Sequence, residues 1–355
     1  MKPTSIGTFS AAILSFSLLT PVMTSSVQAQ PTVQTAMKAV DYACDRPNAG
    51  SMTSITVASL PIVSNAAMFA ADDLGIFEKH GLLPEFKMLG SLPPTISAVQ
   101  GGAVDFAFTG TFNVFQAAER GINLVFVAPF AGIAPGYWTK MQAGEEGYTR
   151  EISAMLAGPD SGIDNPGQLE GKVLALPDSK GQFDLTARAV IRKHGGDPDK
   201  VRYVVMNYSD SINALMAGQV DVAMSLEPVI KKAEDAGFKI ISWPGVEALE
   251  EGPTSAIVAT SEYVGENPEV VARMNCVIRE AAALAQSEPD LLRETTADRQ
   301  KVDPSVLADA IVPHFYSSLD IAGLERFYKL QTEAGFVRGT LDIGALVIPQ
   351  ALASE

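Results

Sequence analysis

Residues with hydroxyl, amide or glycine character recur between predicted strands and helices of this chain, where they could hold a small polar or anionic molecule. Backbone N–H groups at the start of a helix suit a carboxylate, sulfonate or phosphate, and neighbouring hydroxyl groups add hydrogen bonds. The residues that we predict to contact a ligand are Pro61, Ser64, Asn65, Ser91, Thr109, Gly110, Thr111, Phe130, Ser179, Lys180, Gln182, Tyr208 and Glu227.

Charged and aromatic residues near the predicted loops could have more specific roles. Lys180 could pair with an anion, whereas Glu227 could accept hydrogen bonds from an amino group, so the two together would suit a zwitterion. Phe130 could supply the apolar wall that is ordinary in small-molecule sites. Phe112 and Phe183 stand at early helix positions, where an aromatic side chain can equally be part of the core.

Helix capping is the competing explanation for most of these residues, because caps require the same residue types. For Lys180, the alternative is an ordinary exposed loop lysine. We rank Thr109, Gly110 and Thr111 first among the candidates, because they follow the end of a predicted strand.

Catalytic and metal-binding patterns are absent from the sequence. The three histidines, His80, His194 and His314, are far apart, and no G-x-S-x-G, H-E-x-x-H or P-loop motif occurs. The two cysteines, Cys44 and Cys276, form no C-x-x-C pair, which argues against a zinc or redox site. They could form a disulfide in an oxidising compartment or remain two free thiols. We therefore predict a protein that is not an enzyme and uses no cofactor or metal.

Strands alternate with helices along the chain, which predicts an α/β fold with mostly parallel sheets covered by helices. The predicted strands are 55–60, 85–89, 104–108, 124–128, 172–176, 203–206, 220–224 and 254–259. The predicted helices are 66–74, 95–100, 112–119, 183–194, 211–216, 269–286, 290–297, 304–312 and 321–334. In open sheets of this kind, ligands bind beyond the carboxyl ends of the strands, which selects the loops named above.

A segment of the first half is repeated in the second half. Residues 95–108 and 211–224 align at a constant offset of 116 residues, and each contains a short helix, a glycine and a Val-Asp strand start. This repeat favours two related lobes. We assign residues 52–156 and 250–355 to lobe 1 and residues 157–249 to lobe 2. The two chain crossings would form a hinge that closes around a ligand.

The N-terminus has the pattern of a cleavable signal peptide in residues 1–29. Lys2 is followed by an apolar stretch, 11–19, and by the small-residue pattern Val27-Gln28-Ala29. Cleavage after Ala29 would leave 326 of the 355 residues (355 − 29), with residues 30–51 as an N-terminal extension. We therefore expect a periplasmic protein.

The formal charge of −15 argues against nucleic acid as a partner. We expect a monomer whose partners are a small-molecule ligand and a membrane permease.

Four motifs in order resemble the binding proteins for alkanesulfonates, taurine, nitrate and thiamine-pyrimidine precursors (the SsuA and NMT1/THI5-like group). They are Gly75-Ile76-Phe77 with Gly81-Leu82, Gly102 to Gly110, Ser161-Gly162-Ile163 with Leu169 to Val173, and Gly218 to Ala223 with Glu227-Pro228. This resemblance implies a type II periplasmic-binding-protein fold and an ATP-binding-cassette (ABC) permease as partner. The alternatives are a protein that presents its ligand to a receptor and a relative of a pyrimidine-metabolism enzyme.

Overall fold

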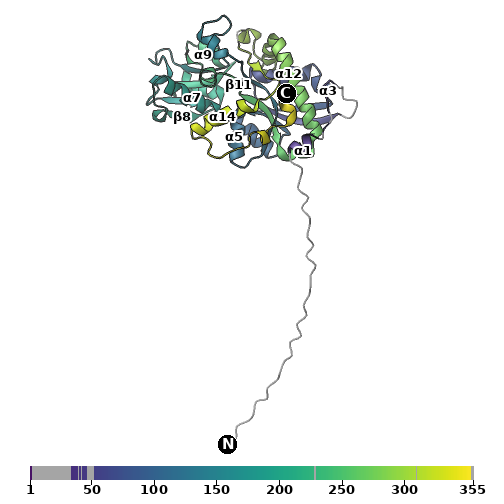
Figure 1. The fold of residues 1–355 in the computed structure, drawn as a ribbon. Helices are drawn as coiled ribbons and strands as arrows, with labels where there is room; N and C mark the ends of the chain where they lie inside the picture. Colours follow the sequence, from purple (N-terminus) through teal and green to yellow (C-terminus); the bar gives the residue numbers. More distant parts are fainter. Residues whose placement is uncertain are drawn as a thin grey trace. The chain divides into compact units, whose positions relative to one another are not determined.

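The computed structural model describes residues 1, 33–38, 40, 42–45, 52–227, 229–308 and 310–352. Most of the predicted signal peptide and much of the N-terminal extension lie outside the described residues. The main body contains two five-stranded sheets and a small three-stranded sheet (Figure 1).

The first sheet has the order β2-β1-β3-β12-β4, in which only β12 runs against the other strands. Its strands are β1 (Thr53–Ser59), β2 (Leu82–Met88), β3 (Phe106–Gly110), β4 (Leu124–Pro129) and β12 (Ser255–Thr260). The associated helices are α2 (Ala66–Asp73), α3 (Ile76–Lys79), α4 (Leu92–Gln100), α5 (Thr111–Glu119), α11 (Ser261–Glu266), α12 (Pro268–Ser287), α13 (Pro289–Gln300) and α14 (Ile321–Glu333).

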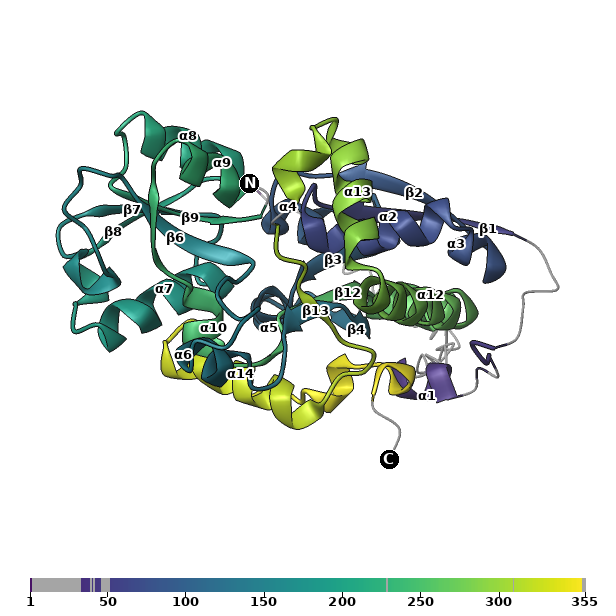
Figure 2. The ribbon, with the colours of Figure 1, turned by 90° about the horizontal axis from the view of Figure 1, so that it is seen from above.

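The second sheet repeats this arrangement with the order β8-β7-β9-β6-β10, and β6 is its one opposed strand. Its strands are β6 (Ser153–Ala157), β7 (Val173–Leu176), β8 (Arg202–Val205), β9 (Val222–Leu226) and β10 (Lys239–Ser242). Its helices are α7 (Gln182–Lys193), α8 (Tyr208–Met216), α9 (Val229–Asp235) and α10 (Pro244–Leu249). Figure 2 shows the elements of this sheet, in teal, gathered beside those of the first. The predicted α/β class with mostly parallel sheets is confirmed.

The 116-residue repeat has a structural basis. Helix α8 begins and ends 116 residues after α4, and strand β9 begins and ends 116 residues after β3. The carboxylate of Asp105 accepts a hydrogen bond of 2.7 Å from the N–H of Thr56, and Asp221 accepts one of 2.8 Å from Val173. Each aspartate thereby fixes the start of its strand against the neighbouring parallel strand, so the Val-Asp motif is structural.

The small sheet joins the segments that connect the two large sheets. Strand β5 (Ala131–Ile133) pairs with β11 (Gly252–Pro253) and with β13 (His314–Phe315). A Cβ atom on Gly132 would lie 2.1 Å from the carbonyl oxygen of Gly252, so only glycine permits this close approach. The two crossings are thus held together side by side.

Several elements differ from the prediction, which did not include the short strands β5, β11 and β13. Strands β6 and β10 were not predicted, and β6 lies in the second sheet. We therefore propose that lobe 2 begins at Ser153 rather than at residue 157. The predicted helix 304–312 is only a 3₁₀ turn over Pro304–Leu307.

A disulfide joins Cys44 to Cys276 of α12, with their Cα atoms 5.2 Å apart. Cys276 is buried. The bond therefore ties the N-terminal extension to the helix that packs on α2 and β4.

Candidate functional site

A cavity lies between the two large sheets, at the carboxyl ends of their strands. Its volume is about 50 Å³, and roughly 10–15 Å³ of such space accommodates one water molecule. The lining residues are Ile62, Ser64, Leu92, Phe108, Gly110, Ala131, Gly132, Ile152, Ser153, Gln182, Phe183, Tyr208, Leu226, Thr254, Ser255 and Pro313. This is where ligands bind in open α/β sheets.

The internal repeat contributes matched positions to the cavity. Leu92 begins α4 and Tyr208 begins α8, and both line it. Gly110 ends β3 and Leu226 ends β9, and both line it as well. Residue positions that are related by the repeat, from both lobes, therefore line the same cavity.

Four of the predicted ligand-binding residues lie in the cavity wall: Ser64, Gly110, Gln182 and Tyr208. Ser64, Gln182 and Tyr208 follow β1, β7 and β8, and Gly110 ends β3. Phe183, for which a core position was the alternative, also lines the cavity and packs on Tyr208 with ring centroids 5.8 Å apart. Phe112 is instead a core residue stacked on Phe327 of α14.

Two predicted residues hold the backbone together instead of facing the cavity. Asn65 is buried and donates to the hydroxyl of Ser59 and the carbonyl of Leu60. Thr111 donates its hydroxyl to the carbonyl of Pro253, across to the returning chain.

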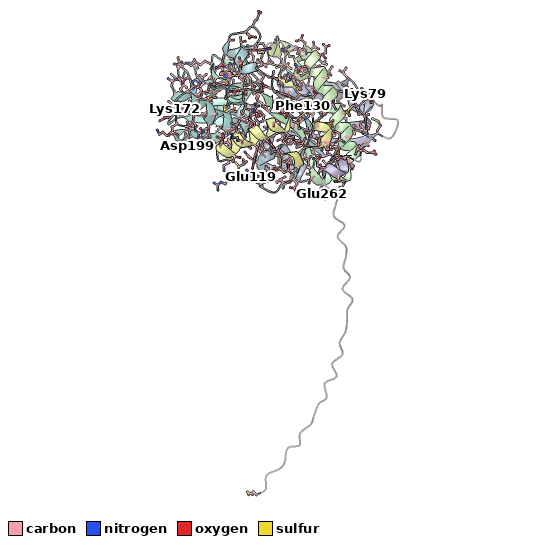
Figure 3. All side chains as sticks on the ribbon, in the orientation of Figure 1. Lys79, Glu119, Phe130, Lys172, Asp199 and Glu262 are labelled. Carbon is pink, nitrogen blue, oxygen red and sulfur yellow. A yellow bond between two sulfur atoms is a disulfide. The ribbon has the colours of Figure 1, made fainter. Side chains whose placement is uncertain are left out.

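Phe130 does not form an apolar wall of the cavity. It is fully buried and packs edge-on against Phe108 and Phe315, and Figure 3 shows it among the inner side chains, with Lys172 and Asp199 at the periphery. Phe108, on which Phe130 packs, lines the cavity instead.

Both charged candidates point elsewhere. Lys180 is exposed, with a φ of 60°, and its side chain does not line the cavity. Glu227 is buried against Arg150, with 3.0 Å between Oε1 and Nη2. Arg150 also binds Glu234, with 2.7 Å between Nη2 and Oε2. The paired carboxylate of Glu227 is therefore committed to holding the crossing segment.

The remaining candidates lie beside the cavity. Pro61 and Ser179 are exposed, Ser91 is half-buried at the start of α4, and Thr109 is fully buried at the end of β3. None of these four lines the cavity.

Sequence reasoning missed most of the apolar lining, together with Ser153, Thr254 and Ser255 from the crossing segments. The repeat offers a signal for one of them, because Gly110 was a candidate and Leu226 stands 116 residues later. The crossing residues carry no comparable signal, since long-range strand pairing brings them to the site: Ser153 lies opposite Leu226, and Ser255 lies opposite Gly110.

Two hydroxyl groups in the wall have no hydrogen-bond partner within the described part of the chain. They belong to Ser64 and Tyr208, whose residues are 2% and 6% exposed. Burial raises the pKa of the Tyr208 phenol, and nearby Asp178 adds to the rise. By contrast, Ser153 donates to Glu151 and Ser255 to the carbonyl of Ala131.

Two buried carboxyl groups flank the cavity. Asp178 accepts hydrogen bonds from the N–H groups of Phe183 and Asp184, at 3.3 and 3.1 Å, and so caps α7. Glu151 accepts from the N–H and hydroxyl of Ser153. Burial raises the pKa of each carboxyl group to about 7.

Among the residues described, no group of histidine, cysteine and acidic side chains is arranged to hold a metal ion. The helices in that same part are all too short or too polar to cross a membrane.

Solved structures share this fold across nearly their whole length. The aliphatic sulphonate-binding protein SsuA of Escherichia coli superimposes with a TM-score of 0.64 at 16% identity, covering 85% of this chain and 99% of that chain. The alkanesulfonate-binding SsuA of Xanthomonas axonopodis, bound to MOPS, gives a TM-score of 0.67 at 15% identity, covering 84% and 99%. The nitrate-binding protein NrtA of Synechocystis gives 0.66 at 13% identity, covering 85% and 88%. The fold is that of the type II periplasmic binding proteins.

Sequence comparison adds a match to part of the chain. Residues 145–291 match the NMT1/THI5-like family model, the group that the four motifs resemble. A Brucella abortus protein named only as a candidate binding protein is 25% identical over 239 residues, covering 67% of this chain and 68% of the relative. These relatives are named for binding and not for catalysis.

Proposed function

We propose that this chain is the extracytoplasmic solute-binding protein of an ABC importer. The observation that carries the proposal is the cavity at the strand ends, lined by equivalent positions of two related lobes. A molecule bound there contacts both lobes, so binding favours the closed arrangement over an open one. The paired crossings β5 and β11 would be the hinge.

Delivery to a permease is supported by the relatives, which include sulfonate- and nitrate-binding proteins and a ligand-binding component of an ABC-type import system. Export is supported by the predicted signal peptide and by the disulfide, which persists in oxidising compartments. We propose cleavage after Ala29 and a monomeric mature protein. N-terminal sequencing of the periplasmic protein tests the cleavage site.

The predicted ligand was a small polar or anionic molecule, either sulfonate-like or nitrogenous. The lining, with six polar side chains and no charged one, supports a polar ligand more than an anion.

A thermal-shift screen of the exported protein, purified from periplasm, tests solute binding. The panel contains sulfonates, amino acids, nitrate, aromatic carboxylates and pyrimidines. A ligand present at 100 times its Kd adds about 2.7 kcal/mol to the free energy of unfolding. If no compound shifts the transition and the protein carries no co-purified small molecule, the proposal is contradicted.

A further inference from the structure

The cavity wall has a chemical character that narrows the ligand class within the proposed function, on which this step rests. We infer that the cavity binds a molecule without net charge, whose apolar body lies against Phe108 and Phe183 and whose polar groups meet the hydroxyls of Ser64 and Tyr208.

Charge is the first criterion. No side chain that lines the cavity is ionised at neutral pH. A charged group loses several kcal/mol of hydration when it is buried without a partner. A ligand with a fixed charge would therefore enter this space at a large cost.

Three of the helix starts near the cavity, those of α7, α5 and α8, already hold an internal acceptor. The carboxylate of Asp178 receives two N–H groups from the first turn of α7. At α5, the N–H of Thr111 donates to the carbonyl of Thr254 at 2.9 Å. At α8, the side chain of Asn207 accepts from the N–H of Asp210 at 2.8 Å. An anion would also meet the negative charge that Asp178 carries when ionised.

The cavity wall also offers no charged partner for a cation. Asp178 and Glu151 do not line the cavity, and their oxygens accept hydrogen bonds from protein groups. Their raised pKa values, about 7, mean that each is partly protonated near neutral pH. Neither therefore serves as a dedicated partner for a positive ligand.

The positive evidence lies in the two unpartnered hydroxyls. Ser64 belongs to the first lobe and Tyr208 to the second, and both side chains are more than nine-tenths buried. A hydroxyl can both donate and accept. Neither hydroxyl oxygen is itself cut off from solvent, so both are open to the cavity. A neutral ligand that hydrogen-bonds to both would replace water there and bridge the lobes.

Matched pairs of compounds test this inference. Benzoate is compared with benzamide and benzenesulfonate with benzenesulfonamide, and the comparison extends to a library of acids with their amides. We expect the neutral member to bind at least tenfold more tightly by isothermal titration calorimetry. Tighter binding of the acids would overturn the inference while supporting solute binding. No binding by any member would contradict the solute-binding proposal, and this inference with it.

Hydroxyl-deletion variants test the contacts, using the tightest neutral compound. Tyr208→Phe and Ser64→Ala should each weaken its binding about tenfold. Tyr203→Phe is the matched control, because that hydroxyl donates to the carbonyl of Pro198, a residue outside the cavity wall. Equal affinity in wild type and in both cavity variants would overturn the assignment.

Discussion

The side-chain nitrogen of Gln331 lies 3.1 Å from the main-chain carbonyl oxygen of Lys180, and Gln116 donates to the same oxygen. Gln331 is on α14 and Gln116 is on α5, both beside the first sheet, whereas Lys180 precedes α7 of the second. Figure 2 shows α14, in yellow, running alongside α5 toward the second lobe. The two amides therefore fasten the lobes together near the cavity.

Removing the hydrogen bonds from Gln116 and Gln331 to Lys180 should favour an open arrangement of the two lobes. The double variant Gln116→Ala and Gln331→Ala loses two hydrogen bonds of about 1 kcal/mol each. We expect a larger radius of gyration without ligand, measured by small-angle X-ray scattering, and up to about tenfold weaker ligand binding. Gln300→Ala is the control, because its bond to the carbonyl of Pro61 lies within the first lobe. An unchanged radius and affinity in the double variant would argue against a hinge held at Lys180.

The ion pair between Arg150 and Glu227 should contribute to stability more than to binding. Glu227→Ala leaves the partly buried Arg150 with only Glu234, and breaking a buried pair typically costs about 3–5 kcal/mol. Urea unfolding should show a loss at or below the low end of that range, because Glu234 remains. Glu170→Ala removes the exposed pair with Lys200 and should cost less than about 1 kcal/mol. Equal losses in the two variants would contradict this account.

Stability should depend on pH through Glu151. Burial raises the pKa of its carboxyl group from 4.5 to about 7, so between these values the folded protein holds more protons than the unfolded chain. Its contribution therefore becomes less favourable as the pH rises through that window, by up to roughly 3 kcal/mol.

The variant Glu151→Gln keeps an oxygen acceptor for Ser153 and removes the titration. Urea unfolding at pH 5 and pH 7 should show a smaller decrease in the variant than in wild type. Glu262→Gln, on the exposed surface of α11 (Figure 3), should leave the decrease unchanged. The same pH dependence in wild type and Glu151→Gln would contradict the assignment.

The disulfide should stabilise the fold by constraining the unfolded chain. It joins residues 232 positions apart, and disulfides typically contribute about 2–4 kcal/mol. The double variant Cys44→Ser and Cys276→Ser should lose that amount in urea unfolding. Treatment with a reducing agent should destabilise wild type and leave the double variant unaffected. Two free thiols in the protein purified without reducing agent, found by mass spectrometry, would contradict the bond.

The sequence predicted much of the fold because the repeat is local. Each copy contains a helix, a glycine turn and a strand held by one aspartate, Asp105 or Asp221. Strands β6 and β10 were missed because β6 follows a long irregular stretch and gains its place only by pairing with β9 and β10. Such long-range pairing leaves little pattern in the segment itself.

The site was harder to predict than the fold. Four residues that the strand-end rule selected, Ser64, Gly110, Gln182 and Tyr208, line the cavity, because these positions follow from local order. It could not separate them from Asn65, Thr111 and Glu227, which have the same residue types but bond to other protein groups. Those choices depend on neighbours that are distant in sequence.

Blocking the cavity tests the central claim most directly. Phenylalanine at Ser64 would place a ring in the ligand space, whereas Ser287→Phe lies on the exposed end of α12. Calorimetric titration with the tightest ligand should give one site per chain in wild type and in Ser287→Phe, and at least 100-fold weaker binding in a folded Ser64→Phe protein. Undiminished binding by folded Ser64→Phe would show that the solute does not occupy this cavity.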